Sequence, residues 1–226
     1  MKIHFIGDVH RMTDSYQKLL RQKFVGERTF QLGDMGVGFA TERGRPGSPN
    51  GGLHVDIMNS GIHKWIRGNH DNPEVARRLT DRGYAGDYGY DPETKLFWVG
   101  GGYSIDRAYR TPGKTWWAEE ELSYLELQRA IELYIEKKPD IVATHEAPSK
   151  AAKYLLYQLP GFRPDKLESS MSRTSEALQV MLDSHEPVEW VFGHYHVSKS
   201  FMLGRTKFSC VNELDVYTVN TNGELE

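Results

Sequence analysis

The stretch KIHFIGDVH, residues 2–10, shows the pattern on which the fold prediction depends. A short apolar run ends in a glycine, and an aspartate and a histidine follow. Runs of about five apolar and β-branched residues that end at glycine or aspartate are typical of buried strands. Similar runs recur along the chain: RTFQLGDMG (28–36), HKWIRGNHD (63–71), KLFWVGGGYS (95–104), DIVATHEAP (140–148), EWVFGHYH (189–196), TKFSCVNE (206–213) and VYTVNT (216–221).

Helical patterns lie between these predicted strands, which together indicate an α/β sheet flanked by helices. The acidic run 119–121 is expected to be the solvated start of one helix. We expect a single domain over residues 1–226. Segments 38–55 and 147–172 are predicted to be loops, and the second is a candidate lid. The predicted helices cover residues 15–24, 73–83, 118–138 and 173–185.

Composition narrows the classes of function. The 226 residues suit one domain with a sizeable core. The net charge of -3 gives no support to nucleic-acid binding, although it does not exclude it. Cys210 is the only cysteine, which rules out a disulfide framework and favours a reducing compartment. With no signal peptide and no apolar run of about 20 residues, we expect a cytoplasmic protein without a membrane partner. The sequence does not indicate an oligomeric state.

Polar residues follow the carboxyl ends of the predicted strands, which is where α/β sheets bind ligands. We expect one sheet edge to gather them. Their oxygen and nitrogen atoms suit Mn²⁺, Fe or Zn²⁺. With His70 set aside, they exceed what one four-coordinate ion needs, whereas two ions sharing a carboxylate would use them all. These residues are Asp8, His10, Asp34, Asn69, His70, His145, His194 and His196.

The motif GHYH, residues 193–196, has a spacing that suits two ions. In an extended chain, residues two apart point to the same side, about 6.6 Å apart at about 3.3 Å per residue. Ions in two-metal sites lie roughly 3.5–4 Å apart. His194 and His196 can therefore bind one ion each, and the same spacing lets Asp8 and His10 hold one ion together.

Five motifs in the same order resemble those of the calcineurin-like metallophosphoesterases, over nearly the whole chain. GGGYSIDRAYR (100–110) followed by WW (116–117) is similar to a segment of small bacterial and phage members. The resemblance implies an α/β fold in which a two-sheet β-sandwich is flanked by helices, in four layers α/β/β/α. The five motifs are GDVH (7–10), GDMG (33–36), GNHD (68–71), TH (144–145) and GHYH (193–196).

The resemblance implies two divalent transition-metal ions. Manganese is the preferred identity, and iron, zinc, nickel and cobalt are alternatives. Water that bridges two such ions loses a proton near neutral pH, and the hydroxide attacks phosphorus. The implied ligands are Asp8, His10 and His196 for the first ion, Asn69, His145 and His194 for the second, and Asp34 as the bridge.

The resemblance also implies catalytic residues outside the metal ligands. His70 is expected to donate a hydrogen bond or proton to the phosphate, and Asp71 to orient His70. From its place just before GNHD, Arg67 is a candidate phosphate contact. Arg107 and Arg173 are weaker candidates in nearby loops.

The expected activity is hydrolysis of a small phosphate ester or nucleotide, with a phosphodiester slightly preferred. Residues 33–38 read GDMGVG and lack the acidic–arginine extension that protein phosphatases of the superfamily carry there. A phosphomonoesterase or Ser/Thr protein phosphatase-like enzyme remains an alternative, as does a nuclease. A non-catalytic binding scaffold is least favoured, because scaffold relatives usually lose metal ligands or the histidine that matches His70.

Overall fold

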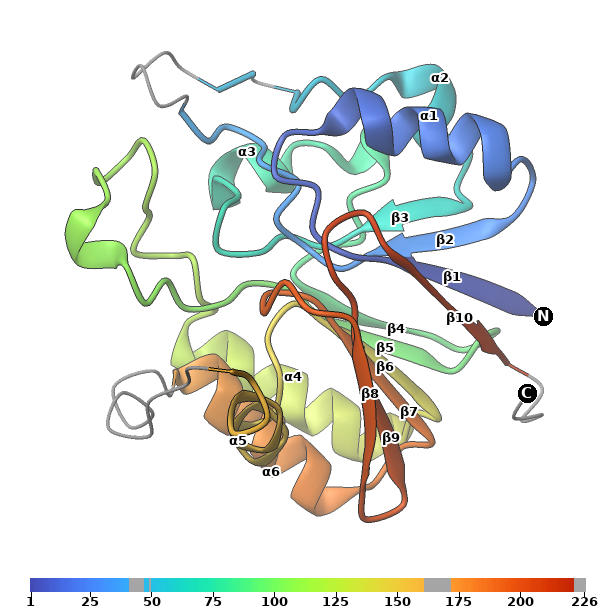
Figure 1. The fold of residues 1–226 in the computed structure, drawn as a ribbon, viewed down its shortest axis with the longest axis vertical. Coiled ribbons are helices and arrows are strands. Elements are labelled where there is room, and N and C mark those ends of the chain that lie inside the picture. Colours follow the sequence, from blue (N-terminus) through green and yellow to red (C-terminus); the bar gives the residue numbers. More distant parts are fainter. Residues whose placement is uncertain (41–46, 49, 161–171, 222–226) are drawn as a thin grey trace.

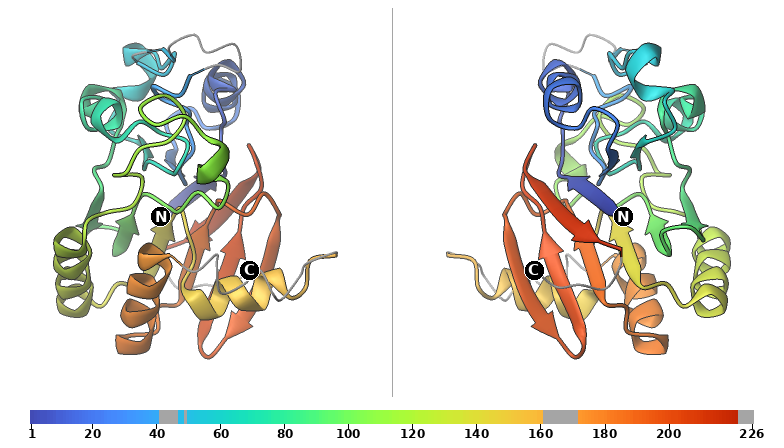
Figure 2. Two further views of the ribbon diagram at one scale, coloured as in Figure 1. Left: turned by 90° about the vertical axis from the view of Figure 1, so that its left-hand side faces the viewer. Right: turned by 90° about the vertical axis from the view of Figure 1, so that its right-hand side faces the viewer.

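A computed structural model describes residues 1–40, 47–48, 50–160 and 172–221, and the description below is confined to them. The chain folds into four layers, with two β-sheets packed face to face and helices on both outer faces (Figure 1). Helices α1–α3 cover one sheet and α4–α6 cover the other (Figure 2). This confirms the α/β/β/α arrangement that the family resemblance implied.

The first sheet has the strand order β10-β1-β2-β3. Strands β1, β2 and β3 run parallel, and β10 is antiparallel to β1. The polar residues that follow β1, β2 and β3 therefore lie at one edge of the sheet. The strands span Lys2–Ile6 (β1), Arg28–Gln31 (β2), His63–Trp65 (β3) and Val216–Asn220 (β10).

The second sheet has the order β4-β5-β6-β7-β9-β8. Its four central strands are parallel, and the edge strands β4 and β8 are antiparallel to their neighbours. The strands span Tyr88–Asp91 (β4), Leu96–Val99 (β5), Ile141–Thr144 (β6), Glu189–Phe192 (β7), Lys199–Leu203 (β8) and Thr206–Cys210 (β9).

The helices pack their apolar faces on the outer sides of the two sheets. Tyr16 and Leu20 of α1 lie in one outer core, and Leu178 and Met181 of α6 lie in the other. The helices span Thr13–Lys23 (α1), Val55–Met58 (α2), Pro73–Arg77 (α3), Tyr124–Lys137 (α4), Ser149–Leu156 (α5) and Arg173–Ser184 (α6), with 3₁₀ turns at Thr80–Arg82 (η1) and Arg107–Tyr109 (η2).

A third core fills the space between the sheets and fixes how they face each other. Phe5 and Phe30 of the first sheet meet Trp98 and Val191 of the second in this core. Since parallel strands bury both faces, their sequences are apolar throughout rather than alternating. The inter-sheet core therefore sets the distance between the two strand edges that carry the polar motifs.

Several predictions about elements need correction. Two sheets, rather than one, present the polar residues. The predicted helix 118–138 begins only at Tyr124, because Ser123 caps it through a capping box with Glu126. Two of the three acids before it are not solvated, since Glu120 and Glu121 are buried while Glu119 is exposed. Within the predicted loop 147–172, Ser149–Leu156 forms α5.

Parts of both predicted loops lie outside the described residues. They are residues 41–46 and 49 of segment 38–55, and residues 161–171 of segment 147–172. The lid prediction for the second segment therefore stays a prediction.

Candidate metal centre

The metal ligands expected from the sequence lie together where the two sheets meet. The loops after β1, β2 and β3 bring three motifs from the first sheet, and the loops after β6 and β7 bring two from the second. The loops are also bonded to each other across the junction, because the backbone N–H of His194 donates to both carboxylate oxygens of Asp8, at 3.2 Å each.

One group of side chains is formed by Asp8, His10, Asp34 and His196, each of which offers a ligand atom within 4.8 Å of the others. His196 Nε2 lies 3.1 Å from Asp8 Oδ2, and His10 Nε2 lies 2.9 Å from His196 Nε2. Asp34 Oδ2 lies 3.7 Å from His10 Nε2. Two carboxylates and two imidazoles at these distances offer the oxygen and nitrogen donors that divalent transition-metal ions take.

A second group lies on the other side of Asp34. His145 Nε2 lies 2.9 Å from Asn69 Oδ1, 3.2 Å from His194 Nδ1 and 3.4 Å from Asp34 Oδ1. His194 Nδ1 lies 3.0 Å from Asn69 Oδ1. The two oxygens of the Asp34 carboxylate thus face different groups of ligands.

The donor and acceptor roles in the second group fit a bound cation. His145 Nδ1 lies 2.9 Å from the carbonyl oxygen of Leu32, which can only accept, so a neutral His145 has its lone pair on Nε2. Asn69 directs its Nδ2 donor to Ser104 Oγ and therefore presents its Oδ1 acceptor to His145 and His194. The lone pairs of His145 Nε2 and Asn69 Oδ1, which converge in a buried place, suit a metal ion.

Burial and neighbouring charge shift the protonation of both groups. Burial opposes the charge on His10, but Asp8 and Asp34 outweigh it and raise its pKa to about 9. Burial likewise opposes ionisation of Asp8, yet hydrogen bonds from His10 and His196 hold the pKa of Asp8 far below its usual range. Burial and repulsion from His145 lower the pKa of His194 to about 3. His194 is therefore neutral and available as a ligand near pH 7.

Backbone conformations at the centre are unusual. His10, Asp34, His194 and His196 have φ angles of 44°, 53°, 69° and 50°, in the left-handed region that L-residues avoid. They make up four of the eight non-glycine residues with positive φ in the described part of the chain. Such strain persists where the surrounding structure holds it, and it clusters at functional sites.

A sequence profile of the calcineurin-like phosphoesterases matches residues 1–198. The chain belongs to this family. Its metal-dependent hydrolysis of phosphate esters follows from that membership, and the aspartate and histidine group provides a candidate metal site. No curated protein sequence matches the chain significantly.

Solved structures share the fold at low sequence identity. The protein TT1561 of Thermus thermophilus is 13% identical with a TM-score of 0.56, and the alignment covers 97% of this chain and 98% of that one. Phosphopantetheinyl hydrolase PptH from Mycobacterium tuberculosis is 13% identical at a TM-score of 0.53, with 94% and 89% covered. GAP50, an anchor in the inner membrane complex of Plasmodium, is 11% identical at 0.50, with 94% and 71% covered.

Arg110 is a candidate functional residue of this phosphoesterase that sequence reasoning missed. Its Nη2 lies 2.7 Å from His70 Nε2, and its Nε pairs with Asp106 at 2.7 Å. Phe39 stacks on the His70 ring with centroids 4.8 Å apart, and the Arg110 guanidinium lies 5.9 Å from the Phe39 centroid. The IDRAYR segment (105–110) was visible in the sequence, but nothing in it distinguished Arg110 from Arg107.

The structure gives Arg67 and Asp71 other partners than the sequence suggested. Arg67 is fully buried, donates from Nε to Asp87 at 2.5 Å and from Nη1 to the Glu120 carbonyl at 2.6 Å. It therefore links loops inside the protein, and this corrects its expected place at the phosphate.

Asp71 is also buried, and its carboxylate binds backbone rather than His70. It accepts from the backbone N–H groups of Met35, Gly36, Val37 and Gly68. Burial and repulsion from Asp34 raise the pKa of Asp71 to about 6. Asp71 thus holds the GDMG and GNHD loops together, and any effect on His70 passes through the backbone.

Arg107 and Arg173 are engaged by other residues, and one acidic residue lies beside the first group. Arg107 lies over the Tyr103 ring at 4.8 Å, and Arg173 donates to the Leu122 carbonyl at 2.9 Å, so both weaker candidates have partners within the protein. Glu213, which the sequence analysis did not consider, lies 3.6 Å from His10 Nε2. It adds a partly exposed negative charge at the rim of the first group.

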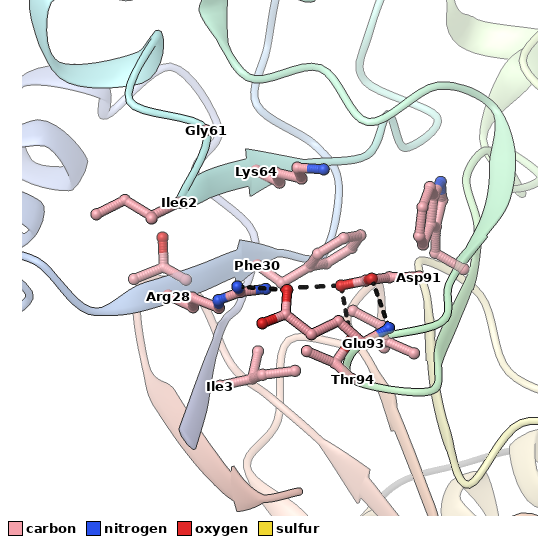
Figure 3. Close-up of a pocket in the computed structure, with 12 residues that line it drawn as sticks. Ile3, Arg28, Phe30, Gly61, Ile62, Lys64, Asp91, Glu93 and Thr94 are labelled. Atoms are coloured by element: carbon pink, nitrogen blue, oxygen red, sulfur yellow. Dashed lines mark hydrogen bonds and ion pairs between the residues drawn. The ribbon is translucent and has the colours of Figure 1, made fainter. Parts of the chain in front are cut away.

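A separate pocket lies at the opposite, amino-terminal ends of the strands. Ile3 of β1 and Arg28 of β2 line it (Figure 3). Leu96 of β5 also lines it, and its volume is about 290 Å³. Arg28 pairs there with Glu93 at 2.7 Å and with Asp91 at 3.7 Å. The protein itself neutralises this guanidinium, so we assign the pocket no role.

None of the helices in the described part of the chain is long and apolar enough to cross a membrane.

Proposed function

We propose that the chain is a phosphodiesterase whose seven ligands hold two divalent metal ions bridged by Asp34. One observation carries the proposal: Asp34 Oδ2 faces His10 at 3.7 Å, while Asp34 Oδ1 faces His145 at 3.4 Å. A carboxylate placed between two ligand groups is what a shared bridge requires. The ions themselves, of which manganese is the preferred identity, would supply positive charge and lower the pKa of water near the phosphate.

The chain's own residues then have separate tasks. His70 and Arg110 stand at the open side of the centre, where His70 is partly exposed and its Nε2 lies 4.0 Å from Asp34 Oδ2. Arg110 is the donor of this pair, since a guanidinium cannot accept and its Nη2 lies 2.7 Å from His70 Nε2. It can bind the non-bridging oxygens of a phosphate and stabilise the charge that builds on them as the ester bond breaks, while His70 orients it. Hydrolysis forms one bond from phosphorus to a water oxygen and breaks the bond to the ester oxygen, which leaves as an alcohol with one proton.

The preference for a diester is supported by two features. The loop after Asp34 reads MGVG and is bound to Asp71 through its backbone, so it presents no arginine to a phosphate dianion. The Phe39 ring beside His70 offers an apolar contact suited to the second organic group of a diester.

A hydrolysis panel tests the proposal. Bis-p-nitrophenyl phosphate, p-nitrophenyl phosphate, cyclic nucleotides, a phosphopeptide and single-stranded DNA would be compared at equal Mn²⁺. We expect the highest kcat/KM for the small diesters. Faster turnover of the monoester or phosphopeptide would favour a phosphatase, and preference for DNA would favour a nuclease. No turnover when the panel is repeated with manganese, iron, zinc, nickel and cobalt in turn would favour a binding scaffold.

Asp34→Asn tests the bridge separately. Loss of one carboxylate charge between the groups should weaken binding of both ions, so metal analysis should show fewer than two Mn²⁺ per chain. His70→Ala should keep the metal and lose rate. Full occupancy and normal turnover in Asp34→Asn would refute the bridging assignment.

A further inference from the structure

Asn69 has to present the oxygen of its amide, and not the nitrogen, to a metal ion. The two ends of an amide side chain are nearly the same in shape, so orientation depends on hydrogen-bond partners. In this structure Oδ1 faces His145 and His194, while Nδ2 points the other way and donates to Ser104 Oγ over 3.1 Å. The question is what prevents the amide from turning over.

Ser104 alone does not decide the orientation, because a hydroxyl can donate as well as accept. Its hydroxyl is engaged by the carboxylate of Glu120, with Ser104 Oγ donating to Glu120 Oε2 over 2.5 Å. The backbone N–H of Ser104 donates to the other oxygen, Oε1, over 3.0 Å. Since the single hydroxyl proton goes to Glu120, Ser104 Oγ can only accept from Asn69.

We propose that Glu120, acting through Ser104, is a positioning residue that fixes the Asn69 amide with its oxygen toward the metal centre. The inference rests on the proposed role of Asn69 as a metal ligand. Glu120 touches neither the substrate nor the ligand atoms. It determines which end of Asn69 is available to them.

The placement of Glu120 supports this role. Glu120 and Ser104 are 3% and 1% exposed, so water does not compete for the hydrogen bonds between them. The backbone carbonyl of Glu120 accepts from Arg67 Nη1 and from the backbone N–H of Gly102, at 2.6 and 3.3 Å, which holds the residue between the GNHD and GGGYS loops. Burying a carboxylate is costly unless it is hydrogen-bonded.

The proposal also accounts for a part of the sequence that the ligand motifs leave unexplained. GGGYS (100–104) follows β5, and the acidic run 119–121 precedes α4. The two segments are distant from the five motifs, yet one side chain from each completes a chain of hydrogen bonds to Asn69. Residues that orient a metal ligand in this way typically change metal affinity or activity 10–100-fold when they are replaced.

The experiment measures Mn²⁺ binding to the metal-free full chain by calorimetry. Glu120→Gln is the main variant, because it keeps size and shape but lets the amide donate to Ser104 Oγ, which frees the hydroxyl proton to point at Asn69. We expect one of the two Mn²⁺ equivalents to bind roughly 10–100-fold more weakly. Ser104→Ala should weaken the same equivalent. Glu121→Gln is the matched control, since Glu121 is buried beside Glu120 but bonds Thr174, and its Mn²⁺ affinity should equal that of the wild type.

A purely structural role for Glu120 predicts a different result. Glu120→Gln would then lower the stability of the metal-free protein, measured by circular dichroism and urea unfolding, while the folded protein kept its Mn²⁺ affinity. That outcome would overturn the proposal. The loss of Mn²⁺ affinity in Glu120→Gln should also depend on residue 69. In an Asn69→Asp background both ends of the side chain are oxygens, so Glu120→Gln should not weaken Mn²⁺ binding further. An equal loss of Mn²⁺ affinity from Glu120→Gln in the wild-type and Asn69→Asp proteins would contradict the positioning role as well.

The positioning role of Glu120 and the ligand role of Asn69 can be tested separately. Asn69→Ala should lose one Mn²⁺ equivalent if Asn69 is a ligand. If Asn69→Ala binds two equivalents normally, the ligand set of the proposed function is wrong. If Asn69→Ala loses one and Glu120→Gln loses none, only the positioning role is wrong.

Discussion

In the proposed function Arg110 lies where a substrate phosphate would meet His70, and it also pairs with the Asp106 carboxylate at 2.7 Å. Its partner Asp106 is half-exposed, while its Nη2 is directed at His70. Phe39 lies close to both side chains and limits how far either can move. The guanidinium is therefore held toward the centre by packing as well as by charge.

Replacing Arg110 with alanine should lower kcat/KM by roughly 10–100-fold, because a hydrogen bond to a charged group is worth about 1.5–3 kcal/mol and each 1.36 kcal/mol is tenfold. Metal content should not change. Arg107→Ala is the matched control, since Arg107 lies over Tyr103 and should leave kcat/KM within twofold of the wild type. Steady-state kinetics on the best substrate of the panel, with metal analysis of each variant, would check this. Equal losses in the two variants would contradict a specific role for Arg110.

Gly68 is a position where one methyl group should be enough to damage the centre. A Cβ there would lie 2.1 Å from Asp34 Oδ1 and 2.6 Å from His145 Nε2, far inside contact distance. We expect Gly68→Ala to lose most Mn²⁺ binding while the metal-free chain still folds. Gly61→Ala is the control: its Cβ would meet nothing within 4 Å, and its positive φ should cost only about 1–2 kcal/mol. Normal Mn²⁺ content in Gly68→Ala would contradict this prediction, because it would show that the loop can move enough to accommodate the added methyl group.

The loop after β3 is joined to the segment before β4 by an ion pair whose arginine is fully buried. Arg67 follows β3 and pairs with Asp87, which precedes β4, and Arg77 of α3 pairs with the same carboxylate at 2.7 Å. Tyr84 donates a further hydrogen bond to Asp87 over 2.9 Å. Burial opposes ionisation of Asp87, but Arg67 and these hydrogen bonds outweigh it and hold its pKa below the usual range.

This link predicts a pH dependence of stability. Because the pKa of Asp87 is depressed in the folded state, its contribution is complete above the unfolded-state pKa of about 3.9 and is lost as pH falls through the folded-state value. Asp87→Asn should reduce the free energy of unfolding by about 3 kcal/mol at pH 7, since it leaves Arg67 buried without its counter-charge. Urea unfolding of both metal-free proteins should show a constant difference down to about pH 5 that narrows below about pH 4. A difference that widens in acid would contradict this account.

Strands that end in ligand motifs were predictable from the sequence, and the edges of the second sheet were not. Central parallel strands such as Ile141–Thr144 are buried on both faces, so they appear as continuous apolar runs. β4 reads YGYD and is partly exposed throughout, and β8 reads KSFML with alternating exposure, so neither stands out. The second sheet itself came from the family resemblance, because local periodicity carries no information on which strands pair.

For the centre, residue types and order indicated the seven side chains that the fold brings together, whereas the partners of the supporting residues were missed. Arg67 and Asp71 flank or belong to the GNHD motif, yet their partners come from distant segments that only the folded chain brings close. Glu120 appeared to be a solvated acid because its neighbours are acidic. Tertiary contacts of this kind have no signature in spacing or composition.

The proposed two-ion centre should stabilise the contact between the two sheets, because three ligand-bearing loops come from the first sheet and two from the second. Free energy gained by binding to the folded state alone adds about 2.7 kcal/mol per ion at 100 times its Kd. For a chain of this size 1 kcal/mol shifts Tm by about 2–4 °C, so calorimetry should show Mn²⁺ raising Tm by about 5–11 °C per ion and EDTA reversing it. Asp34→Asn should lose most of the shift in Tm.

Hydrogen exchange should also slow on Mn²⁺ binding, both in the loops after β1–β3 and in those after β6 and β7, since ions that bind ligands from both sheets stabilise both sets of loops. Slower exchange on one sheet only would mean that the ions bind without joining the sheets.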